Sequence, residues 1–375
     1  MSRLDKCHNI AGLREAARGY LPRLVFDYID GGVDDETCLR RNRDAFEHVT
    51  LLPDYLVDVS QLSLHRTLLG RRYNMPLGMA PTGLASFARH GADLMLARAA
   101  NHAGVPFVLS GAGTASIEAA AQAAPEQTWF QLYVSREQRI TEDLVRRAHD
   151  AGMQHLVVTV DVPVHSNRER DVRNGFVPPV KPGLSVIGNA LLHPAWLMQM
   201  LRHGLPRFES WAPYAAPGAS AKQIADLFTS QIPFTQTWRD LARLRAIWPG
   251  HLIVKGILHP ADAQRAIEAG ADGVWVSNHG GRVLDCAPSA VTMLPLIRQA
   301  VGPDVAVMVD GGVRRGSDVI KALALGADFV FAGRPMMYGV AAAGQRGAEK
   351  ALSILQREMQ LTVSQLGGWG TATPP

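Results

Sequence analysis

Eight short apolar runs, each followed by a polar or glycine-bearing segment, constrain the fold of this chain more than any other feature. They lie at residues 77–80, 107–109, 129–132, 156–160, 252–254, 273–276, 305–309 and 329–331. Strands that alternate with helices form βα units with right-handed crossovers and a parallel sheet. Eight units predict a closed (β/α)₈ TIM barrel. The alternative is an open doubly wound sheet, which would need a glycine-rich dinucleotide loop early in the chain; the sequence has none there.

Helix-forming segments occupy the intervals between these runs. They are expected at 91–103, 116–122, 142–151, 260–269, 294–300 and 317–325. Two more helices are expected before the barrel, between residues 9 and 30, with Asn9 as an N-cap, Pro22 opening the second helix and glycines 31 and 32 ending it. We therefore expect a single domain over residues 1–375, with the barrel at about 75–345.

Composition narrows the class of protein. With 47% apolar and 19% charged residues the chain is globular, and its three scattered cysteines fit a reducing, cytoplasmic compartment without disulfides. The polar start carries no secretory signal, and no uninterrupted apolar run is long enough to span a bilayer. A net charge of +4 favours anionic ligands or an anionic membrane surface and is too diffuse to predict nucleic-acid binding.

The interval between the fourth and fifth strands is far longer than a βα connection requires, which indicates an insertion at about 176–236. Its segment 184–206 is apolar, contains Trp196 and is flanked by Lys181, Arg202 and Arg207. This composition is typical of an interfacial segment, so we expect peripheral contact with the inner face of the cell membrane; an additional core helix with a lid is the alternative. Residues 211–236, rich in Ala, Pro, Ser and Gln, are expected to form a mobile loop over the barrel mouth.

Polar side chains and glycines follow all eight predicted strands, at the face where barrel enzymes carry their chemistry. The residues at these strand ends are Pro81, Thr82, Gly83, Ser110, Gln131, Tyr133, Thr159, Asp161, Lys255, Ser277, His279, Arg282, Asp310, Gly311, Gly312, Val313, Arg314, Gly333 and Arg334. Any one of them alone is compatible with an ordinary turn. Because the whole set falls at one face, it predicts a functional site.

Two parts of this set favour a phosphorylated, planar cofactor. The glycines after the last two strands, with Arg314 and Arg334, are typical of a phosphate site, although a metabolite phosphate would fit as well. The neutral groups Thr82, Ser110, Gln131 and Thr159 suit the edge of a planar heterocycle. Lys255 would stabilise negative charge on a reduced ring; a Schiff base and a simple ion pair are its alternatives.

The remaining members favour oxidation of a 2-hydroxy acid. Asp161 would fix the tautomer of His279 and make it a general base. Arg168 and Arg282 match a carboxylate in two-point geometry. Tyr28, whose alternative role is packing, and Tyr133 would add hydroxyl donors. No metal site is expected, because the histidines lack metal-ligand spacing.

The motifs FDYIDGG, NRDAF, APTG, WFQLYV, TVDVPV, VKGIL, SNHGGRVLD, VDGGVRRGSDVIKALALGA and AGRP run nearly end to end. With them the chain resembles the FMN-dependent α-hydroxy acid dehydrogenases and oxidases. The RERD stretch and the HPAW–RHGLP insertion are most similar to the membrane-associated bacterial (S)-mandelate dehydrogenase branch. The resemblance implies that His279 is the base, paired with Asp161, and that Arg168, Arg282, Tyr28 and Tyr133 hold the substrate. It implies that the remaining strand-end residues bind FMN.

The resemblance also implies a homotetramer that oxidises an (S)-2-hydroxy acid, mandelate-like or lactate-like, and passes electrons to a membrane quinone. Oxidases of the family often carry Ala where this chain has Gly83, which favours a dehydrogenase. Two other functions remain open at this point. One is a soluble oxidase that reduces O₂ to hydrogen peroxide. The other is a non-redox phosphate-binding barrel or membrane-attached scaffold.

Overall fold

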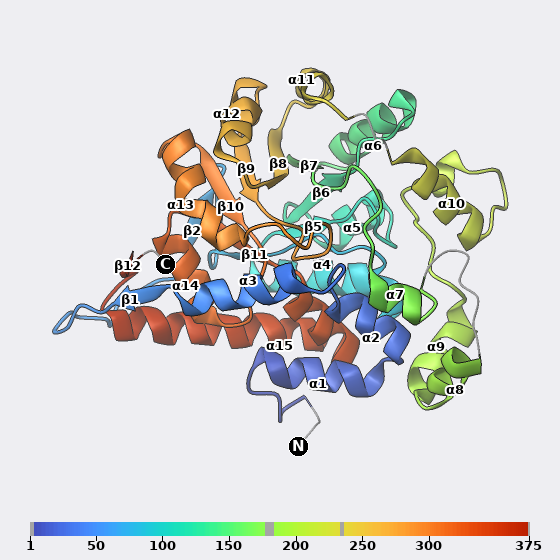
Figure 1. Cartoon of the computed structure of the whole chain (residues 1–375), viewed down its shortest axis with the longest axis horizontal. Coiled ribbons are helices and arrows are strands. Elements are labelled where there is room, and N and C mark those ends of the chain that lie inside the picture. Colours follow the sequence, from blue (N-terminus) through green and yellow to red (C-terminus); the bar gives the residue numbers. More distant parts are fainter. Residues whose placement is uncertain (1–3, 177–183, 233–235, 374–375) are drawn as a thin grey trace.

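The computed structural model describes residues 4–176, 184–232 and 236–373, and its centre is a closed barrel of eight parallel strands (Figure 1). Around the barrel the strands follow the order β10-β11-β4-β5-β6-β7-β8-β9. Their bounds are β4 Leu77–Met79, β5 Phe107–Leu109, β6 Thr128–Leu132, β7 His155–Thr159, β8 His251–Ile257, β9 Gly273–Val276, β10 Ala306–Val309 and β11 Phe329–Ala332. The predicted (β/α)₈ architecture is confirmed.

One end of the barrel is filled and closed. Trp129, Trp275, Phe329 and Phe331 lie among the buried residues of the interior. The hairpin of β2 (Arg66–Leu68) and β3 (Arg71–Tyr73) adds Tyr73, whose ring lies 5.4 Å from that of Phe329. Because side chains close this end, ligands can reach the barrel only at the carboxyl ends of its strands. A separate antiparallel pair joins β1 (Thr50–Leu52) to β12 (Thr371–Thr373).

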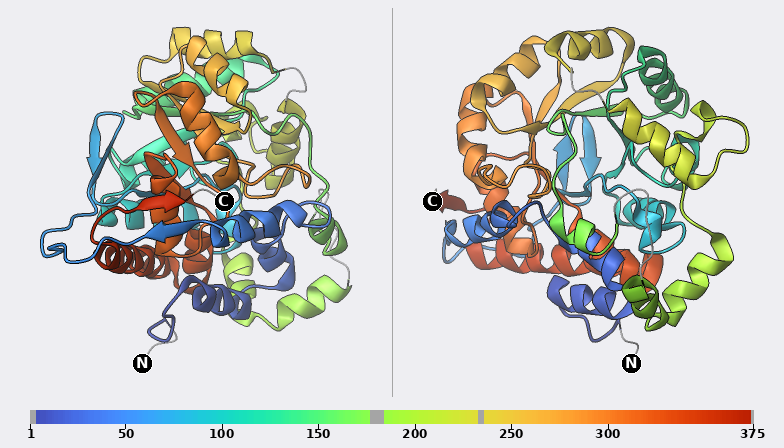
Figure 2. Two further views of the ribbon diagram at one scale, coloured as in Figure 1. Left: turned by 60° about the vertical axis from the view of Figure 1, so that its left-hand side comes forward. Right: turned by 45° about the vertical axis from the view of Figure 1, so that its right-hand side comes forward.

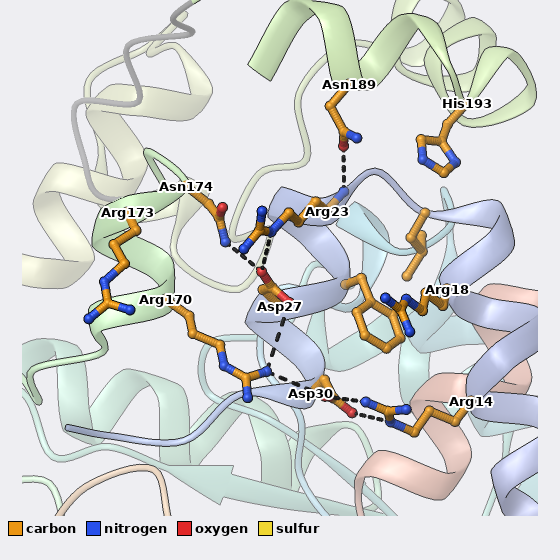
Figure 3. Close-up of a pocket in the computed structure, with 12 residues that line it drawn as sticks. Arg14, Arg18, Arg23, Asp27, Asp30, Arg170, Arg173, Asn174, Asn189 and His193 are labelled. Atoms are coloured by element: carbon orange, nitrogen blue, oxygen red, sulfur yellow. Dashed lines mark hydrogen bonds and ion pairs between the residues drawn. The ribbon is translucent and has the colours of Figure 1, made fainter. Parts of the chain in front are cut away.

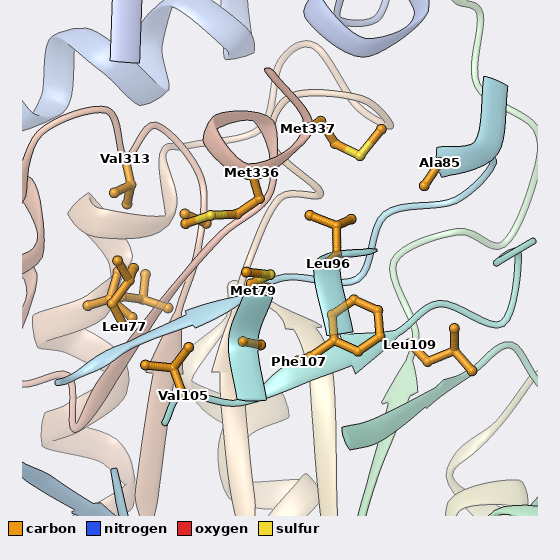
Figure 4. Packing of buried hydrophobic residues seen from close by; sticks show 14 of the residues in the cluster. Leu77, Met79, Ala85, Leu96, Val105, Phe107, Leu109, Val313, Met336 and Met337 are labelled. Atoms are coloured by element: carbon orange, nitrogen blue, oxygen red, sulfur yellow. The ribbon is translucent and has the colours of Figure 1, made fainter. Parts of the chain in front are cut away.

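A ring of helices covers the outside of the barrel (Figure 2). It comprises α4 Ala92–Ala103, α5 Ile117–Ala123, α6 Gln138–Asp150, α12 Pro260–Glu268, α13 Ala290–Val301, α14 Gly316–Ala324 and the long α15 Arg334–Leu366, and η1 (Ala85–Phe87) precedes α4. Figure 4 shows the packing: Leu77 and Phe107 of the barrel meet Leu96 of α4 and Met336 of α15 within one buried cluster. All six predicted outer helices are present.

The N-terminal helices bring residues to the open end of the barrel. Asn9 accepts a hydrogen bond from the Gly12 N–H (2.8 Å) and so caps α1 (Ile10–Tyr20). Pro22 precedes α2 (Arg23–Asp30), which ends at Gly31, as the sequence predicts. Helix α2 carries Tyr28, and α3 (Thr37–Glu47) follows it.

The connection from β7 to β8, which includes the predicted insertion at about 176–236, is helical. It contains α7 Glu169–Arg173, α8 Leu184–Leu191, α9 Pro194–His203, η2 Ala212–Tyr214, α10 Ala221–Gln231 and α11 Trp238–Ile247. The expected loop over 211–236 is wrong at α10, because Ser220 and Gln223 form a capping box and Phe228 is buried against Trp211. The parts of the insertion at 177–183, which include Lys181, and at 233–235 lie outside the described residues.

Candidate active site

His279 and Asp161, which the sequence predicts to be a general base and its partner, meet at the barrel mouth. His279, three residues after the end of β9, places its Nδ1 3.0 Å from Oδ1 of Asp161, which follows β7. The backbone of His279 has a φ of 56°, a left-handed conformation that its N–H stabilises by donating to Ser277 Oγ (3.0 Å). Gly280 and Gly281, with φ of 65° and 72°, continue this tight turn. The aspartate therefore fixes one ring nitrogen and leaves Nε2 for a substrate.

Burial lowers the pKa of His279, and the positive charges of Lys255 and Arg168 act in the same direction, whereas Asp161 opposes them. The net direction is below the ordinary value of about 6.5. Asp161 itself keeps a pKa below its usual range: burial acts to raise it, and the adjacent His279 and Lys255 outweigh that effect. A neutral imidazole beside an ionised carboxylate is the state that a general base requires.

We expect activity to fall in acid as His279 becomes protonated. Because its pKa lies below about 6.5, kcat/KM should stay level at neutral pH and decline only below that value. In Asp161→Asn the opposing negative charge is lost, so the acid limb should move to lower pH while the maximal rate falls. The measurement is kcat/KM against pH for both proteins. An acid limb that moves to higher pH in the variant would contradict the assigned pairing.

Two arginines at the mouth, Arg168 and Arg282, form no ion pair with a carboxylate of the described residues. Arg282 donates hydrogen bonds of 2.8 Å to the carbonyls of Tyr28 and Gly31, and Arg168 donates to Ser166 Oγ (3.2 Å). Burial, followed by the charge of Arg168, lowers the pKa of Arg282 to about 10. A desolvated Arg282 beside the positive charge of Arg168 favours binding of an anion, and a carboxylate matches a guanidinium in two-point geometry.

Both predicted tyrosines border this pair of arginines. The Tyr28 hydroxyl donates to the Gly83 carbonyl (3.3 Å), and its ring lies 5.0 Å below the Arg282 guanidinium. Tyr28 also packs on Phe176, with ring centroids 4.7 Å apart, so it has a packing contact as well as a position at the mouth. Burial raises the pKa of Tyr133, which keeps its hydroxyl protonated as a donor.

Lys255 takes part in a buried ion pair, one of the alternatives open at the sequence level. Its Nζ lies 3.2 Å from Asp310 Oδ2 and donates to Ser277 Oγ (2.9 Å), while the Ser277 hydroxyl donates to Asp310 Oδ1 (2.6 Å). Because Ser277 Oγ also accepts the His279 N–H, the lysine and the base share one network. An ammonium has three donors, so one of them remains for a ligand at the mouth.

A family comparison is consistent with this geometry. The model of the FMN-dependent dehydrogenase family matches residues 17–371. The chain belongs to this family. It is 42% identical to the (S)-mandelate dehydrogenase of Pseudomonas putida over 96% of this chain and 90% of that protein, and 40% identical to the L-lactate oxidase of Nostoc sp. over 98% and 96%. A crystal structure of the monotopic membrane protein (S)-mandelate dehydrogenase matches with a TM-score of 0.94 at 41% identity, covering 97% and 96% of the two chains.

FMN is the cofactor of this family, and the mouth of the barrel fits a flavin ring. Gln131 Oε1 accepts from Ser110 Oγ and from the Gly111 N–H, both at 3.1 Å. That leaves Gln131 Nε2 buried without a partner among the described residues, and Thr159 Oγ1 is buried in the same state. The edge of a planar heterocycle at the mouth would supply hydrogen-bond partners for Gln131 Nε2 and Thr159 Oγ1. Thr82, which donates weakly to Met337 Sδ, and Pro81 lie in the segment after β4.

The expected phosphate end of the flavin site also fits an anion. Arg334 donates to the carbonyls of Ile29 (3.1 Å), Gly31 (2.7 Å) and Gly280 (2.9 Å), so its side chain is more engaged with backbone than the sequence indicates. Burial, then the charges of Arg282 and Arg314, lower its pKa to about 9. The glycines after β10, with Val313, precede α14, and Gly333 precedes α15. Helix N-termini beside mutually repelling arginines are the features that favour an anion. Among the described residues, no group of three or more His, Cys, Asp or Glu could hold a metal.

Sequence reasoning assigned no role to Asn42, although it begins the quoted NRDAF motif. Its amide exchanges hydrogen bonds with Asn278, at 2.9 Å and 2.8 Å, and Asn278 also donates to the Pro288 carbonyl (2.9 Å). Helix α3 thus holds the loop that carries His279. Asn42 and Asn278 are far apart in the sequence, so no local pattern predicts that their side chains meet. Predicting this pair would require knowing that α3 packs over the mouth of the barrel.

Proposed function

We propose that this protein oxidises an (S)-2-hydroxy acid to the 2-oxo acid and passes the electrons through FMN to a membrane quinone. The observation that carries the proposal is the His279–Asp161 pair beside two half-buried arginines, Arg168 and Arg282, that form no ion pair within the described residues. The named activities of the relatives, on (S)-mandelate and L-lactate, support the same substrate class.

Each residue of the site has a separate role in oxidising the 2-hydroxy acid. Arg168 and Arg282 bind the substrate carboxylate, which relieves their mutual repulsion. Tyr28 and Tyr133 orient the hydroxyl group, and Nε2 of His279 removes a proton while Asp161 stabilises the imidazolium. The oxidation removes two electrons and two protons from the substrate; His279 takes one proton, and FMN held at the strand ends would supply the acceptor for the two electrons and the second proton. The Lys255 ammonium offsets negative charge at the ring. The products are the 2-oxo acid and the two-electron-reduced enzyme.

An aromatic wall beside the tyrosine favours an aryl substituent on the substrate. Phe176 contacts Tyr28, and Phe87 meets Phe176 edge-on with ring centroids 5.3 Å apart. Aromatic pairs of this kind add to simple burial of area. We therefore expect the mandelate-like acid to reduce the enzyme with a higher kcat/KM than lactate or glycolate, measured with all three in one anaerobic assay.

Exposed apolar side chains on the insertion support membrane contact and hence a membrane acceptor. Leu191, Leu192, Leu201 and Leu205 are 63%, 75%, 71% and 65% exposed. Trp196 on α9 is buried instead, and its indole donates to the Phe87 carbonyl (2.7 Å), which fixes α9 to the barrel. No described helix is long and apolar enough to cross a bilayer. An apolar face held this way suits a helix lying in the interface of the inner membrane leaflet.

Removing this apolar face should release the protein from membranes. In Leu191→Ser/Leu201→Ser, we expect partitioning onto vesicles to fall by roughly 10- to 100-fold, since two leucines lose their burial in lipid. The matched control is Leu296→Ser/Leu361→Ser, two leucines half exposed on α13 and α15. Vesicle flotation measures both. Equal loss in the two variants would contradict the assigned face.

The electron acceptor has its own test. We expect the substrate-reduced enzyme to be reoxidised rapidly by a quinone analogue and slowly by air. Hydrogen peroxide formed in equal amount with the 2-oxo acid, at the rate of turnover, would identify an oxidase and contradict the quinone acceptor. A homotetramer, supported by the family resemblance alone, is expected on light scattering.

A further inference from the structure

A cavity of about 710 Å³ lies outside the active site, between the N-terminal helices and the insertion (Figure 3). Helices α1, α2, α7 and α8 line it. Five arginines face it against two carboxylates: Arg14, Arg18, Arg23, Arg170 and Arg173 with Asp27 and Asp30. Figure 3 shows the two carboxylates at the centre with the arginines around them. The lining is therefore rich in guanidinium groups, which recognise phosphate in two-point geometry.

The arginines of this cavity fall into two groups. Arg14 holds Asp30 through two bonds of 2.7 Å and 2.8 Å, and Arg170 pairs with Glu36 (2.5 Å) and Asp30 (3.5 Å). Arg14 and Arg170 therefore form ion pairs with carboxylates that are largely buried. The second group, Arg18, Arg23 and Arg173, is 65%, 75% and 75% exposed at the side chain.

Within the described residues, each member of the exposed group forms an ion pair with one carboxylate nearby in the sequence. Arg18 lies 3.9 Å from Glu15, Arg23 lies 3.2 Å from Asp27, and Arg173 pairs with Glu169, all one helical turn away. The Arg18 and Arg173 pairs are exposed at both side chains and contribute little, so an entering phosphate can displace them. Asp27 is only 12% exposed, but it also accepts from the Asn174 amide (2.7 Å), so it keeps a donor when Arg23 turns toward a phosphate. These three guanidinium groups are therefore the part of the lining that can reorganise around an anion.

The cavity borders the apolar face formed by Leu191, Leu192, Leu201 and Leu205. Asn189 of α8 accepts the Arg23 N–H at 2.6 Å, which joins the insertion to the start of α2. His193 lines the cavity, and its Nδ1 is buried without a partner among the described residues. Between these two lining residues in the chain stand Leu191 and Leu192, both exposed. If an amphipathic ligand placed its phosphate in the cavity, its apolar chain would lie beside α8 and α9.

We propose that this cavity binds the phosphate of an anionic phospholipid headgroup while α8 and α9 lie among the acyl chains. This inference rests on the membrane contact proposed above and adds lipid selectivity to it. The polar end of the lipid would meet Arg18, Arg23 and Arg173. A free phosphate has the same recognition chemistry, and the experiment separates the two sources.

The experiment is flotation of the FMN-loaded protein with vesicles of phosphatidylcholine alone or with added phosphatidylglycerol. At about 1 kcal/mol per basic residue near a membrane surface, three arginines should give a preference for anionic vesicles on the order of a hundredfold at low salt. In Arg18→Gln/Arg23→Gln/Arg173→Gln most of that preference should disappear, while partitioning onto neutral vesicles stays at its wild-type level.

The matched control removes three exposed arginines elsewhere on the surface. Arg139→Gln/Arg146→Gln/Arg243→Gln changes net charge equally on α6 and α11, and these side chains are 84%, 62% and 66% exposed. It should keep nearly the full preference. Melting temperature and flavin content, measured without vesicles, confirm that both variants are folded.

The outcomes distinguish failure of the headgroup site from failure of the membrane contact. Equal binding of the wild type to both kinds of vesicle overturns the headgroup site and leaves the membrane contact standing, and so does equal loss of preference in the two variants. Binding to neither kind of vesicle overturns both. Inorganic phosphate and short-chain phosphatidylglycerol are then compared by titration calorimetry. Inorganic phosphate bound as tightly as the lipid, with the same loss in the first variant, would overturn the lipid assignment in favour of a soluble phosphate.

Discussion

His279→Asn should bind FMN normally and lose reduction by substrate. General-base catalysis contributes roughly 10²- to 10⁴-fold, so the anaerobic rate of flavin reduction should fall by that factor. Asparagine is chosen because the backbone at 279 is left-handed (φ 56°), a conformation that Asn tolerates better than most residues. The rate of bleaching in stopped flow, with flavin content measured beside it, separates loss of the base from loss of the cofactor.

The control for this variant is His102→Asn, a surface histidine that pairs with Glu349. It should reduce at the wild-type rate. If His279→Asn is reduced as fast as His102→Asn, the base lies elsewhere. If it has lost its flavin, the loop from Ser277 to Arg282 is part of the cofactor site in a way that the network around Ser277 Oγ does not explain.

Lys255→Met should be the most destabilising single change at the site. It leaves the Asp310 carboxylate buried without its cation, and breaking one partner of a buried pair costs about 3–5 kcal/mol. The variant should unfold at a lower urea concentration and purify with little FMN, since Ser277 and Asp310 lose a shared partner.

The double variant Lys255→Met/Asp310→Asn tests whether the pair is the cause. Because no unpaired charge remains, it should recover much of the stability lost in Lys255→Met, and the two substitutions should be strongly non-additive. Unfolding midpoints of the four proteins, compared without FMN, provide the coupling. Simple additivity would show that the lysine stabilises the fold through contacts other than Asp310.

The barrel was predictable because its signal is local and repeated. Each strand is a buried apolar run, and each run ends in a polar or glycine-bearing segment, so parallel pairing alone brings those ends to one face. This is why His279 and Asp161, from different strands, are found 3.0 Å apart as expected. The same reasoning placed the two arginines beside them.

The features that sequence reasoning missed depend on partners distant in the chain. The Ala, Pro, Ser and Gln content of residues 211–236 predicts a loop, although the Ser220–Gln223 capping box is a local signal for the start of α10. The Lys255–Asp310 pair was one alternative among three, and only the fold shows that the side chains meet. The Asn42–Asn278 amide pair and the contacts of Arg334 with three carbonyls follow from how α2 and α3 cover the mouth.

The most direct test of the central claim is anaerobic mixing of the purified protein with an (S)-2-hydroxy acid. The enzyme should be yellow with bound FMN, and its visible flavin absorbance should bleach on addition of (S)-mandelate, with one equivalent of 2-oxo acid formed per flavin. The (R) enantiomer should leave the colour unchanged. A flavin-loaded protein that none of mandelate, lactate or glycolate bleaches would contradict the account.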